Sequence, residues 1–498
     1  MGSHSNTAAV LGLDALSKQL LLKALEEGYM PYFSSISGSD RVIIKNLRCV
    51  PPLTASSWPT IMSGVNPGKH GIFSFYRLNR EYKRLDLYNT LWLEHPRIHE
   101  MVSFSGRRVK SFVFNPIPEK PIIPVKDSTI VSNMFFSGGL IYYPKNINKR
   151  ILSVILDGQK YVSQYYKASG CESVKVISDL YNNYIIPLAE EVVDQGYDLI
   201  WFNLDMPDHI LHKCQDILTS NRIDLLSEFF REVDRIIKLF VENYDIKIVV
   251  SDHGFDKFEK MVSINDILVK NGLGTITRQP LFDFITKKEE HDNIVWVNPK
   301  LIRMLEKLRI KPVAKKIFRF FKKDAFVISS MFLDPFNSDA YYLRRTYGIY
   351  FNNKDSIAKT LDVLSSYTDY LTYYPSKEVY SGDYVHLGPD IVVLPKDGVN
   401  FGSLEIYGSD VISKTGADHH LYGVFVAIDS GLDIDSVGSE IVPNYIVAPL
   451  VMCRMGIPVP HDSDANNILE ALGLKCDKAN YIGKWKIAKR IFVKMKMK

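Results

Sequence analysis

Short apolar runs recur along the chain, and stretches with helical spacing separate them. The first run, Ala8–Leu13, is too short for an isolated helix and is typical of a buried parallel strand. Residues 17–28 then carry apolar side chains at helical spacing, and Gly28 is a suitable helix end. Further strand-like runs cover 197–204, 246–251, 390–394 and 423–428, with helical stretches such as 180–194 and 223–242. This alternation predicts a doubly wound α/β fold with a mostly parallel central sheet flanked by helices.

One stretch in the second half of the chain interrupts this alternation. Residues 301–323 are basic and amphipathic, and Pro312 divides them into two predicted helices. We therefore predict a catalytic α/β core at 6–255 and 341–475, a cap insertion at 256–340, and a C-terminal tail at 476–498.

The C-terminal tail is predicted to form a basic amphipathic helix. Its Lys and Arg residues alternate with Trp485, Ile487, Ile491 and Phe492, which is typical of helices that lie at a membrane interface. A solvated helix packed against the body of the protein is the alternative. Both interpretations stay open from the sequence.

The composition is that of a globular protein. The 498 residues are 46% apolar and 23% charged, enough to bury a large core. A net charge of +5 is small for this length and indicates no specific nucleic acid partner. No apolar run reaches the about 18 residues that span a bilayer, and no secretory signal precedes the first strand. The pattern does not specify an oligomeric state.

The cysteines are few, scattered and odd in number. The chain has five, at 49, 171, 214, 453 and 476, and none forms a Cys-x-x-Cys pair. We therefore predict no disulfide framework and a reducing compartment, which indicates a cytoplasmic location, with peripheral membrane contact left open. Cys214 lies two residues after His212, but a buried structural cysteine is the simpler interpretation than a metal ligand.

Asp and His residues gather at the ends of the apolar runs. In doubly wound sheets, ligands bind beyond the carboxyl ends of the strands. Carboxylate and imidazole groups bind Zn²⁺, Mn²⁺ and Fe, so their repetition predicts a two-metal site. Asp208 and His212 are one helical turn apart and can share a face. His419 precedes a strand, so we expect it on a loop that folds back over the site. The candidate ligands are Asp14, Asp208, His212, Asp252, His253 and His419.

Thr54 is the candidate nucleophile. It follows a proline-rich extended lead-in, and metal coordination would lower the pKa of its alcohol enough for attack. If Thr54 begins a helix, the amides of the first turn can hold phosphate oxygens. A simple helix-capping role for the hydroxyl is the alternative.

These segments together resemble the type I phosphodiesterase/nucleotide pyrophosphatase-like branch of the alkaline phosphatase superfamily. Residues 54–72 (TASSWPTIMSGVNPGKHGI) resemble its nucleophile segment. The other motifs follow in the order of that family: Gly12-Leu13-Asp14, Asp208 with His212, Asp252-His253-Gly254, and His419 with Gly423. The resemblance runs over residues 8–472, nearly the whole chain.

The resemblance implies an alkaline-phosphatase-like fold and a phosphoryl hydrolase that cleaves phosphodiester or pyrophosphate bonds. The reaction would be a two-metal in-line displacement through a phospho-threonine intermediate. Asp208, His212 and His419 would hold one ion, and Asp14, Asp252 and His253 would hold the other, with Thr54 bound to that second ion. The expected ions are two divalent metals, Zn²⁺ before Mn²⁺ or Fe.

The resemblance further implies a small phosphodiester, nucleotide or pyrophosphate-type substrate. Ala55 and Asn89 are the expected substrate-binding residues. Asn89 is chosen because the stretch at 73–76, where the family has a phosphate-binding Asn, contains none. Aromatic residues such as Trp58, Phe73 and Tyr76 offer surfaces for a nucleotide or a lipid-like group.

Several alternatives stay open. His420 adjoins His419, and only the spacing to Gly423 favours His419. Arg77 and Arg80 are the candidates for a phosphate-clamping arginine. The chain could instead be a phosphomonoesterase or phosphomutase of the same superfamily. From a different class, it could be a metal-stabilised, membrane-associated binding protein.

Overall fold

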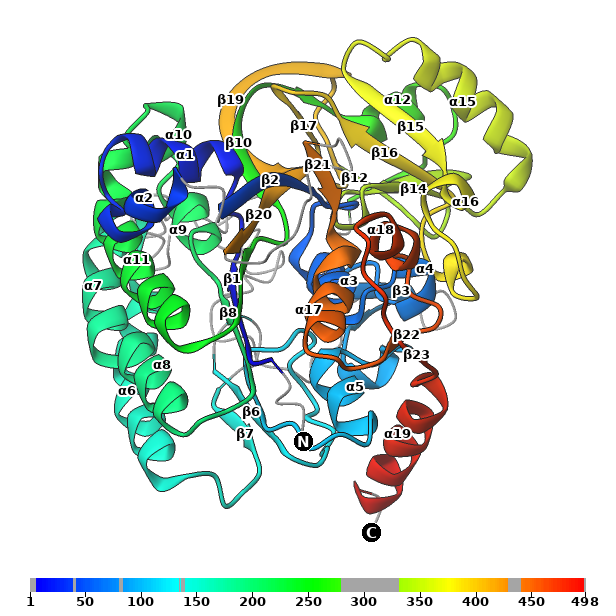
Figure 1. Cartoon of the computed structure of the whole chain (residues 1–498). Helices are drawn as coiled ribbons and strands as arrows, with labels where there is room; N and C mark the ends of the chain where they lie inside the picture. The colour runs from blue at the N-terminus through cyan, green and yellow to red at the C-terminus, as the bar shows by residue number, and fades with distance from the viewer. Residues whose placement is uncertain are drawn as a thin grey trace, which may run out of the picture.

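A nine-stranded sheet forms the centre of the molecule, in the order β21-β2-β20-β9-β1-β8-β5-β6-β7 (Figure 1). The computed structural model describes residues 6–38, 42–79, 84–133, 135, 139–278, 331–428 and 440–496. The strands of the central sheet are β1 (Ala8–Leu13), β2 (Val42–Arg48), β5 (Ser111–Phe114), β6 (Ser128–Ser132), β7 (Ile141–Tyr143), β8 (Leu199–Leu204), β9 (Ile246–Val250), β20 (Tyr422–Ile428) and β21 (Ile441–Pro443).

The middle of this sheet is parallel. β1 pairs in parallel with β8 and β9, so Ala8 lies opposite Leu199 on one side and Ile246 on the other. β5 is parallel to β8 and β6, and β2 to β21, whereas β20 runs antiparallel to both its neighbours and β7 to β6. The predicted doubly wound, mostly parallel sheet is therefore confirmed.

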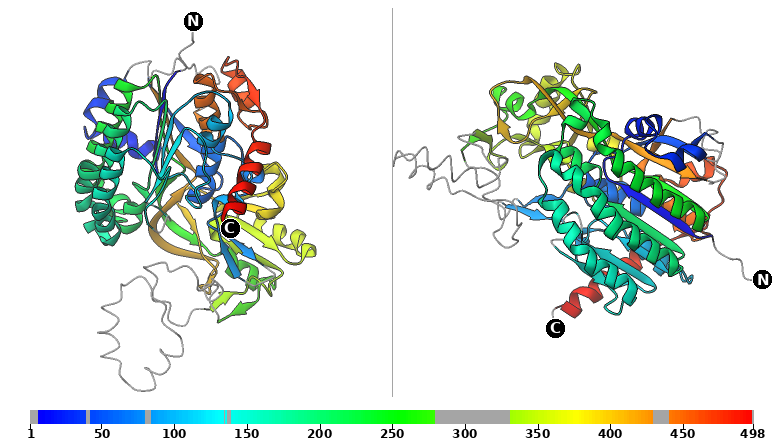
Figure 2. Two further views of the ribbon diagram at one scale, coloured as in Figure 1. Left: turned by 90° about the horizontal axis from the view of Figure 1, so that it is seen from below. Right: turned by 90° about the vertical axis from the view of Figure 1, so that its left-hand side faces the viewer.

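Helices cover both faces of the sheet, and this explains why β1 is apolar throughout. Alternate residues of a strand point to opposite faces. Leu11 joins one hydrophobic core and Val10 the other. One face is covered by α1 (Lys18–Glu26), α2 (Pro31–Ser37), α6 (Lys149–Lys167), α7 (Ile177–Leu180), α8 (Ile186–Asp194) and α11 (Ser227–Asn243), the layer that faces the viewer in the right view of Figure 2. The other face is covered by α3 (Thr54–Ser63), α5 (Ile98–Phe104) and α17 (Val447–Arg454).

A second set of small sheets follows β9 along the chain and shares its own hydrophobic core. These sheets have the orders β17-β10-β19, β11-β12-β18 and β13-β14-β16-β15. Their strands are β10 (Gly254–Val262), β11 (Ile276–Thr277), β12 (Met331–Leu333), β13 (Ala340–Leu343), β14 (Gly348–Phe351), β15 (Leu371–Pro375), β16 (Ile391–Pro395), β17 (Val399–Phe401), β18 (Glu405–Ile406) and β19 (Val411–His420). Helices α12 (Ile264–Lys270), α15 (Ile357–Ser365) and α16 (Ser376–Val379) belong to the same region.

The long antiparallel pair of β10 and β19 matters for the site. Its register places His419 opposite Phe255, so the end of β19 returns to the carboxyl end of β9. The expected return of His419 toward the site is thus made by a strand rather than a loop. The predicted boundaries of core and cap stay a prediction, and the predicted basic helices at 301–323 lie outside the described residues.

The remaining elements are short, apart from the last helix. They are α4 (Pro67–His70), α9 (Asp208–Lys213), α10 (Asp216–Thr219), α18 (Asn466–Ala471), β3 (Tyr76–Asn79), β4 (Arg84–Leu87), β22 (Val459–Pro460), β23 (Lys478–Ala479) and α19 (Ile482–Lys496). Helix α19 is the predicted C-terminal helix and extends beyond the body (Figures 1 and 2). Trp485 fixes it by donating a hydrogen bond from Nε1 to the Leu93 carbonyl at 2.7 Å. None of the helices in the described ranges is long and apolar enough to cross a membrane.

Four of the five cysteines form disulfides, so the prediction of no disulfide framework was wrong. Cys171 pairs with Cys214 and Cys453 with Cys476, while Cys49 is free and buried. Both pairs join segments whose proximity depends on the fold, which spacing along the chain does not reveal. Disulfides persist in oxidising environments, so the cysteines no longer support a reducing compartment. Cys214 is a disulfide partner and not a metal ligand.

Candidate active site

Three carboxylates meet at one edge of the central sheet. Asp14 follows β1, Asp208 begins the helix α9 after β8, and Asp252 follows β9. Because β8, β1 and β9 are parallel neighbours, their carboxyl ends lie side by side. The backbone ties these ends together, since the Asp208 amide donates to the Asp14 carbonyl at 3.0 Å. The Ala15 amide donates to Asp252 Oδ1 at 3.3 Å.

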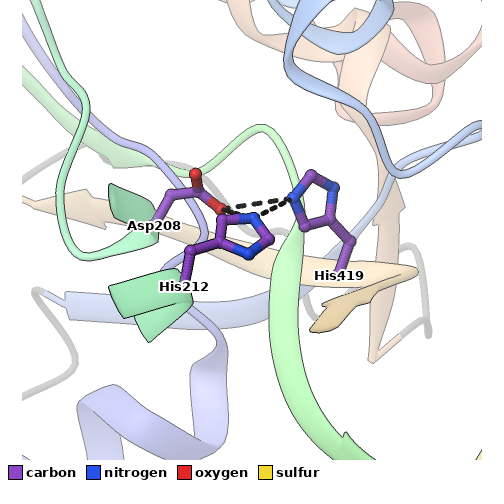
Figure 3. A group of neighbouring side chains, drawn as sticks. All are labelled: Asp208, His212 and His419. Carbon is purple, nitrogen blue, oxygen red and sulfur yellow. Dashed lines mark hydrogen bonds and ion pairs between the residues drawn. The ribbon is translucent and has the colours of Figure 1, made fainter. Parts of the chain in front are cut away.

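The first ligand group consists of Asp208, His212 and His419 (Figure 3). Asp208 and His212 share one face of α9, as their spacing predicted, and His419 reaches them from the end of β19. The Nε2 atoms of His212 and His419 lie 3.4 and 3.3 Å from Asp208 Oδ1. The three potential ligand atoms lie within 4.8 Å of one another, close enough to share one metal ion.

A second ligand group lies beside the first, and its histidine, His253, is fully buried. Asp14, Asp208 and His253 offer ligand atoms that are also within 4.8 Å of one another. His253 Nε2 is 3.3 Å from Asp14 Oδ1 and 3.4 Å from Asp252 Oδ2. Asp208 therefore lies between the two groups. The rings of His253 and His419 stack with centroids 3.9 Å apart, which brings the groups into direct contact.

Thr54 is the first residue of α3 and lies against the second group. Its side chain is buried, and its Oγ1 is 3.2 Å from His253 Nε2. The next turn of α3 supports the same group, because Trp58 Nε1 donates to Asp14 Oδ2 at 3.4 Å. The first amides of a helix have no partner within the helix and attract anions. Thr54 and Ala55 are the residues that present these amides beside the threonine hydroxyl.

Backbone carbonyls hold the outer nitrogens of two of the histidines. His419 Nδ1 lies 3.0 Å from the Pro52 carbonyl, and His253 Nδ1 lies 3.0 Å from the Gly254 carbonyl. Carbonyls only accept hydrogen bonds, so each Nδ1 carries the proton and each Nε2 presents a lone pair to the carboxylates. Metal-binding histidines are oriented in this way by their surroundings.

The carboxylates are in an environment that disfavours three negative charges. Burial, followed by repulsion from Asp252, raises the pKa of Asp14 well above its usual value. Burial, followed by repulsion from Asp208, raises the pKa of Asp252 to about 7. In the described part of the structure, Asp14 Oδ1, Asp208 Oδ1 and Asp252 Oδ2 are buried and receive no hydrogen bond. Buried carboxylate oxygens that lack donors and face imidazole lone pairs fit bound cations.

The pKa values of the three histidines shift in different directions. Burial lowers the pKa of His253 to about 3 and also lowers that of His212, which keeps both neutral and able to ligate. For His419 burial acts in the same direction, but the interaction with Asp208 outweighs it and raises the pKa. Burial would raise the pKa of Asp208, yet His212 and His419 outweigh it and lower the pKa.

The contacts of three other candidate residues, His420, Asn89 and Trp58, bear on the roles that the sequence left open for them. His420 does not join the ligand groups, because its Nε2 pairs with the exposed Asp397 at 3.2 Å. Asn89 caps a short helix, accepting a hydrogen bond from the Leu91 amide at 2.9 Å, and no described contact joins it to the carboxylates. Trp58 is fully buried and contacts Asp14, so it offers no open surface to a nucleotide.

An arginine pair that the sequence analysis missed lies beside the first ligand group. Arg344 forms an ion pair with Asp418, whose carboxylate also accepts the backbone amide of His419 at 2.8 Å. Burial opposes ionisation of Asp418, but Arg344 outweighs burial and lowers the pKa. After burial and repulsion from His419, the neighbouring Arg345 contributes to the lowered pKa of His212. Two consecutive arginines directly after an apolar strand were the signal in the sequence.

A family model decides the identity of the chain. The model of the type I phosphodiesterase / nucleotide pyrophosphatase family matches residues 8–405. The chain belongs to this family. The resemblance inferred from the motifs is thereby confirmed, and membership supports phosphoryl hydrolysis as the activity. No curated protein sequence matches the chain significantly.

Solved structures agree with the family in fold. Phosphonoacetate hydrolase from Sinorhizobium meliloti 1021, in complex with phosphonoformate, has a TM-score of 0.56 at 12% identity, over 91% of this chain and 96% of that chain. Human ectonucleotide pyrophosphatase / phosphodiesterase 5 has a TM-score of 0.51 at 11% identity, over 94% of this chain and 99% of that chain. At such identities the likeness extends to the alkaline-phosphatase-like fold alone.

Proposed function

We propose that the protein hydrolyses phosphodiester or pyrophosphate bonds of small molecules through a phospho-threonine intermediate, with two divalent metal ions. The observation that carries the proposal is the position of Thr54. Its hydroxyl lies at the start of a helix, 3.2 Å from His253 Nε2, beside the two ligand groups. A purely structural metal site needs no hydroxyl there. This position therefore favours the hydrolase over a metal-stabilised binding protein.

The ligand assignment takes the first group as it stands: Asp208, His212 and His419 would hold one ion. Asp14, Asp252 and His253, with Thr54, would hold the other, because His253 Nε2 lies 3.3 Å from Asp14 Oδ1 and 3.4 Å from Asp252 Oδ2. When bound, such ions lower the pKa of the hydroxyl and of water and offset the charge of the transferred phosphoryl group. Mixed imidazole and carboxylate ligation suits Zn²⁺ first, with Mn²⁺ and Fe as alternatives.

The side chains of the protein would then act in two steps. Thr54 Oγ1 loses its proton and attacks phosphorus, and the bond to the leaving alcohol or phosphate breaks as the bond to Oγ1 forms. The leaving group takes up a proton. Water then attacks the phospho-threonine, the Oγ1–phosphorus bond breaks, and Thr54 regains its proton. The first amides of α3, at Thr54 and Ala55, would hold phosphoryl oxygens in both steps.

Helix α19 supports a second, separate proposal of contact with an anionic membrane surface. Its outer face exposes Ile487, Ile491 and Met495, which are 56, 54 and 69% exposed. These positions are four residues apart and so lie along one side of the helix. Exposed Lys and Arg residues flank them, including Lys486, Arg490 and Lys494. Basic side chains beside exposed apolar ones are the features of an interfacial helix.

The hydrolase proposal is tested with a panel of bis-p-nitrophenyl phosphate, p-nitrophenyl phosphate and dinucleotides, each with Zn²⁺ or Mn²⁺ and with chelator. We expect metal-dependent cleavage that favours the diesters. Thr54→Ala should lose at least about 10³-fold in turnover while it keeps its metal. Ser63→Ala is the matched control, since Ser63 donates to the Pro59 carbonyl at the far end of α3. No cleavage by metal-loaded protein would refute the hydrolase, and monoester preference would favour the phosphomonoesterase alternative.

A further inference from the structure

Asp418 directly precedes the proposed ligand His419 near the end of β19, and its side chain faces the small sheets. Successive residues of a strand point to opposite faces. His419 accordingly reaches Asp208 Oδ1 with its Nε2, at 3.3 Å (Figure 3). Asp418 turns instead toward Arg344 and Asn400. Asp418 belongs to neither ligand group, although it adjoins a member of one. Its carboxylate is therefore placed to hold the ligand rather than the ion.

Both oxygens of the Asp418 carboxylate accept hydrogen bonds. Oδ1 accepts the backbone amide of His419 at 2.8 Å. Oδ2 accepts Asn400 Nδ2 at 3.0 Å and forms the ion pair with Arg344. Hydrogen bonds to ionised groups are roughly twice as strong as those between neutral groups. The three donors together fix one orientation of the Asp418 side chain, and in that orientation it holds the amide of His419.

The two side chains that bind Asp418 are themselves held in place. Arg344 begins the short helical turn between β13 and β14, and the Tyr347 amide donates to the Arg344 carbonyl at 3.1 Å. Asn400 is 7% exposed, and its Oδ1 accepts the Phe401 amide at 2.8 Å, which leaves Nδ2 directed at Asp418. The rings of Tyr347 and Phe401 pack in one hydrophobic core, with centroids 6.5 Å apart. The small sheets thus present a fixed pair of donors.

Asp418 also lies opposite another carboxylate. The register of β10 and β19 pairs Asp256 directly with Asp418. Like charges directly opposite each other in an antiparallel pair destabilise the pairing. The ion pair between Arg344 and Asp418 offsets this repulsion at the residue next to His419. Loss of the guanidinium should therefore loosen the end of β19, and His419 with it.

We propose that Arg344 is a positioning residue, which fixes His419 through Asp418 and so sets the geometry of the first ligand group. This inference rests on the metal ligands assigned in the proposed function. Residues that orient metal ligands from outside change metal affinity about 10- to 100-fold when they are replaced. A direct contact between Arg344 and a phosphoryl group of the substrate is the competing role. The two roles predict different measurements.

The test measures zinc affinity by competition with a metallochromic chelator, so it needs no turnover. We expect two Zn²⁺ to bind the unmodified chain. Arg344→Met should weaken one of them at least about tenfold and leave the other unchanged. Asp418→Ala should do the same, and adding Arg344→Met to it should cause no further loss, because the first residue acts through the second. Arg222→Met is the matched control and should keep both affinities, since Arg222 pairs with Asp224 at 2.8 Å and both side chains are 54% exposed.

Three results would overturn the inference. Additive losses in the double variant would mean that Arg344 does not act through Asp418. Equal weakening of both ions, with a lower melting temperature, would mean a general structural role. Unchanged zinc affinity in Arg344→Met would exclude positioning, and weaker inhibition by inorganic phosphate would then assign Arg344 to the substrate. Should Asp418→Ala fail to fold, Asp418→Asn takes its place in the comparison.

These results are distinct from failure of the proposed function. Two bound zinc ions in a chain that cleaves no phosphoester would refute the hydrolase alone, because the zinc affinities still report on Arg344. Metal-dependent cleavage together with unchanged zinc affinity in Arg344→Met would refute the positioning role alone. An unmodified chain that binds no zinc would overturn both.

Discussion

The Nε2 atoms of His212 and His419 lie 2.9 Å apart, although His212 is on helix α9, His419 is near the end of strand β19, and 207 positions separate them in the chain. His419 Nδ1 faces the Pro52 carbonyl, so its Nε2 carries a lone pair. Asp208 Oδ1 adds further electron density at 3.3 Å from the same nitrogen. Lone pairs that converge in this way repel one another unless a cation or a proton lies between them.

We therefore expect His419→Ala to remove about one equivalent of bound metal per chain, because three ligands would be reduced to two. Turnover should fall at least about 100-fold. Metal content is measured by mass spectrometry after gel filtration. His420→Ala is the matched control, since His420 pairs with exposed Asp397. Equal metal loss from both variants would contradict the assignment of His419.

Asp252 supplies a prediction about pH. Its pKa of about 7 in the folded protein is raised by burial and then by repulsion from Asp208. The native state thus holds a proton that the unfolded state releases near pH 4. Native protein binds more protons between these values, so this carboxyl lowers the stability of metal-free protein as the pH rises from about 4 to about 7.

An asparagine at position 252 cannot ionise, so the Asp252→Asn variant should not lose stability through this group as the pH rises. In the presence of chelator, we expect the free energy of unfolding of Asp252→Asn to rise relative to that of the unmodified protein by up to roughly 4 kcal/mol between pH 4 and 7. With metal the order should reverse, because the carboxylate becomes a ligand. Urea denaturation at several pH values measures this. Asp397→Asn, at a 93% exposed side chain, should show no such trend. A pH-independent difference for Asp252→Asn would contradict the buried, repelled carboxyl.

The central sheet and the meeting of carboxylates at its edge could be predicted because both depend on short stretches of the sequence. A buried parallel strand such as β1 needs a continuous apolar run, and parallel neighbours bring the residues that follow them together. Asp14 and Asp252 were found in this way. The D-x-x-x-H spacing of Asp208 and His212 has the same local origin, since one helical turn places both on one face.

Features that depend on distant parts of the chain could not be predicted. Arg344 reaches Asp418 only because the small sheets fold over the end of β9, and no periodicity encodes that contact. The choice of His419 over His420 depends on the pairing of β19 with β10. The disulfides depend on the packing of whole helices. Cys171 and Cys214 are 43 residues apart, and chain-closure entropy changes slowly with length, so separation alone does not identify partners.

The Cys171–Cys214 disulfide should matter for the site as well as for stability. Cys214 directly follows α9, the helix that carries Asp208 and His212. Replacing both cysteines by serine should lower the free energy of unfolding by about 4 kcal/mol on the chain-entropy model and also weaken metal binding. Cys453→Ser with Cys476→Ser is the matched control. These two cysteines are 23 residues apart, and no residue of the ligand groups lies between them in the sequence. Removing this disulfide should lower the free energy of unfolding by about 3 kcal/mol and leave metal binding unchanged. Denaturation and metal titration measure both, and equal metal affinity in the two variants would contradict the link to α9.

Helix α19 gives a prediction that separates membrane contact from packing. Ile487→Ser with Ile491→Ser removes apolar surface from the outer face and leaves the buried Trp485 in place. Each isoleucine that leaves water on binding contributes roughly 1 kcal/mol at its half-exposed area, so the partition coefficient for phosphatidylserine vesicles, measured by sedimentation, should fall roughly 30-fold. Salt should weaken the remaining binding, because basic side chains supply it. Leu156→Ser is the matched control, since Leu156 is 55% exposed on α6. The thermal stability of all variants should be unchanged. Equal sedimentation of the double variant and the unmodified chain would refute membrane contact through α19.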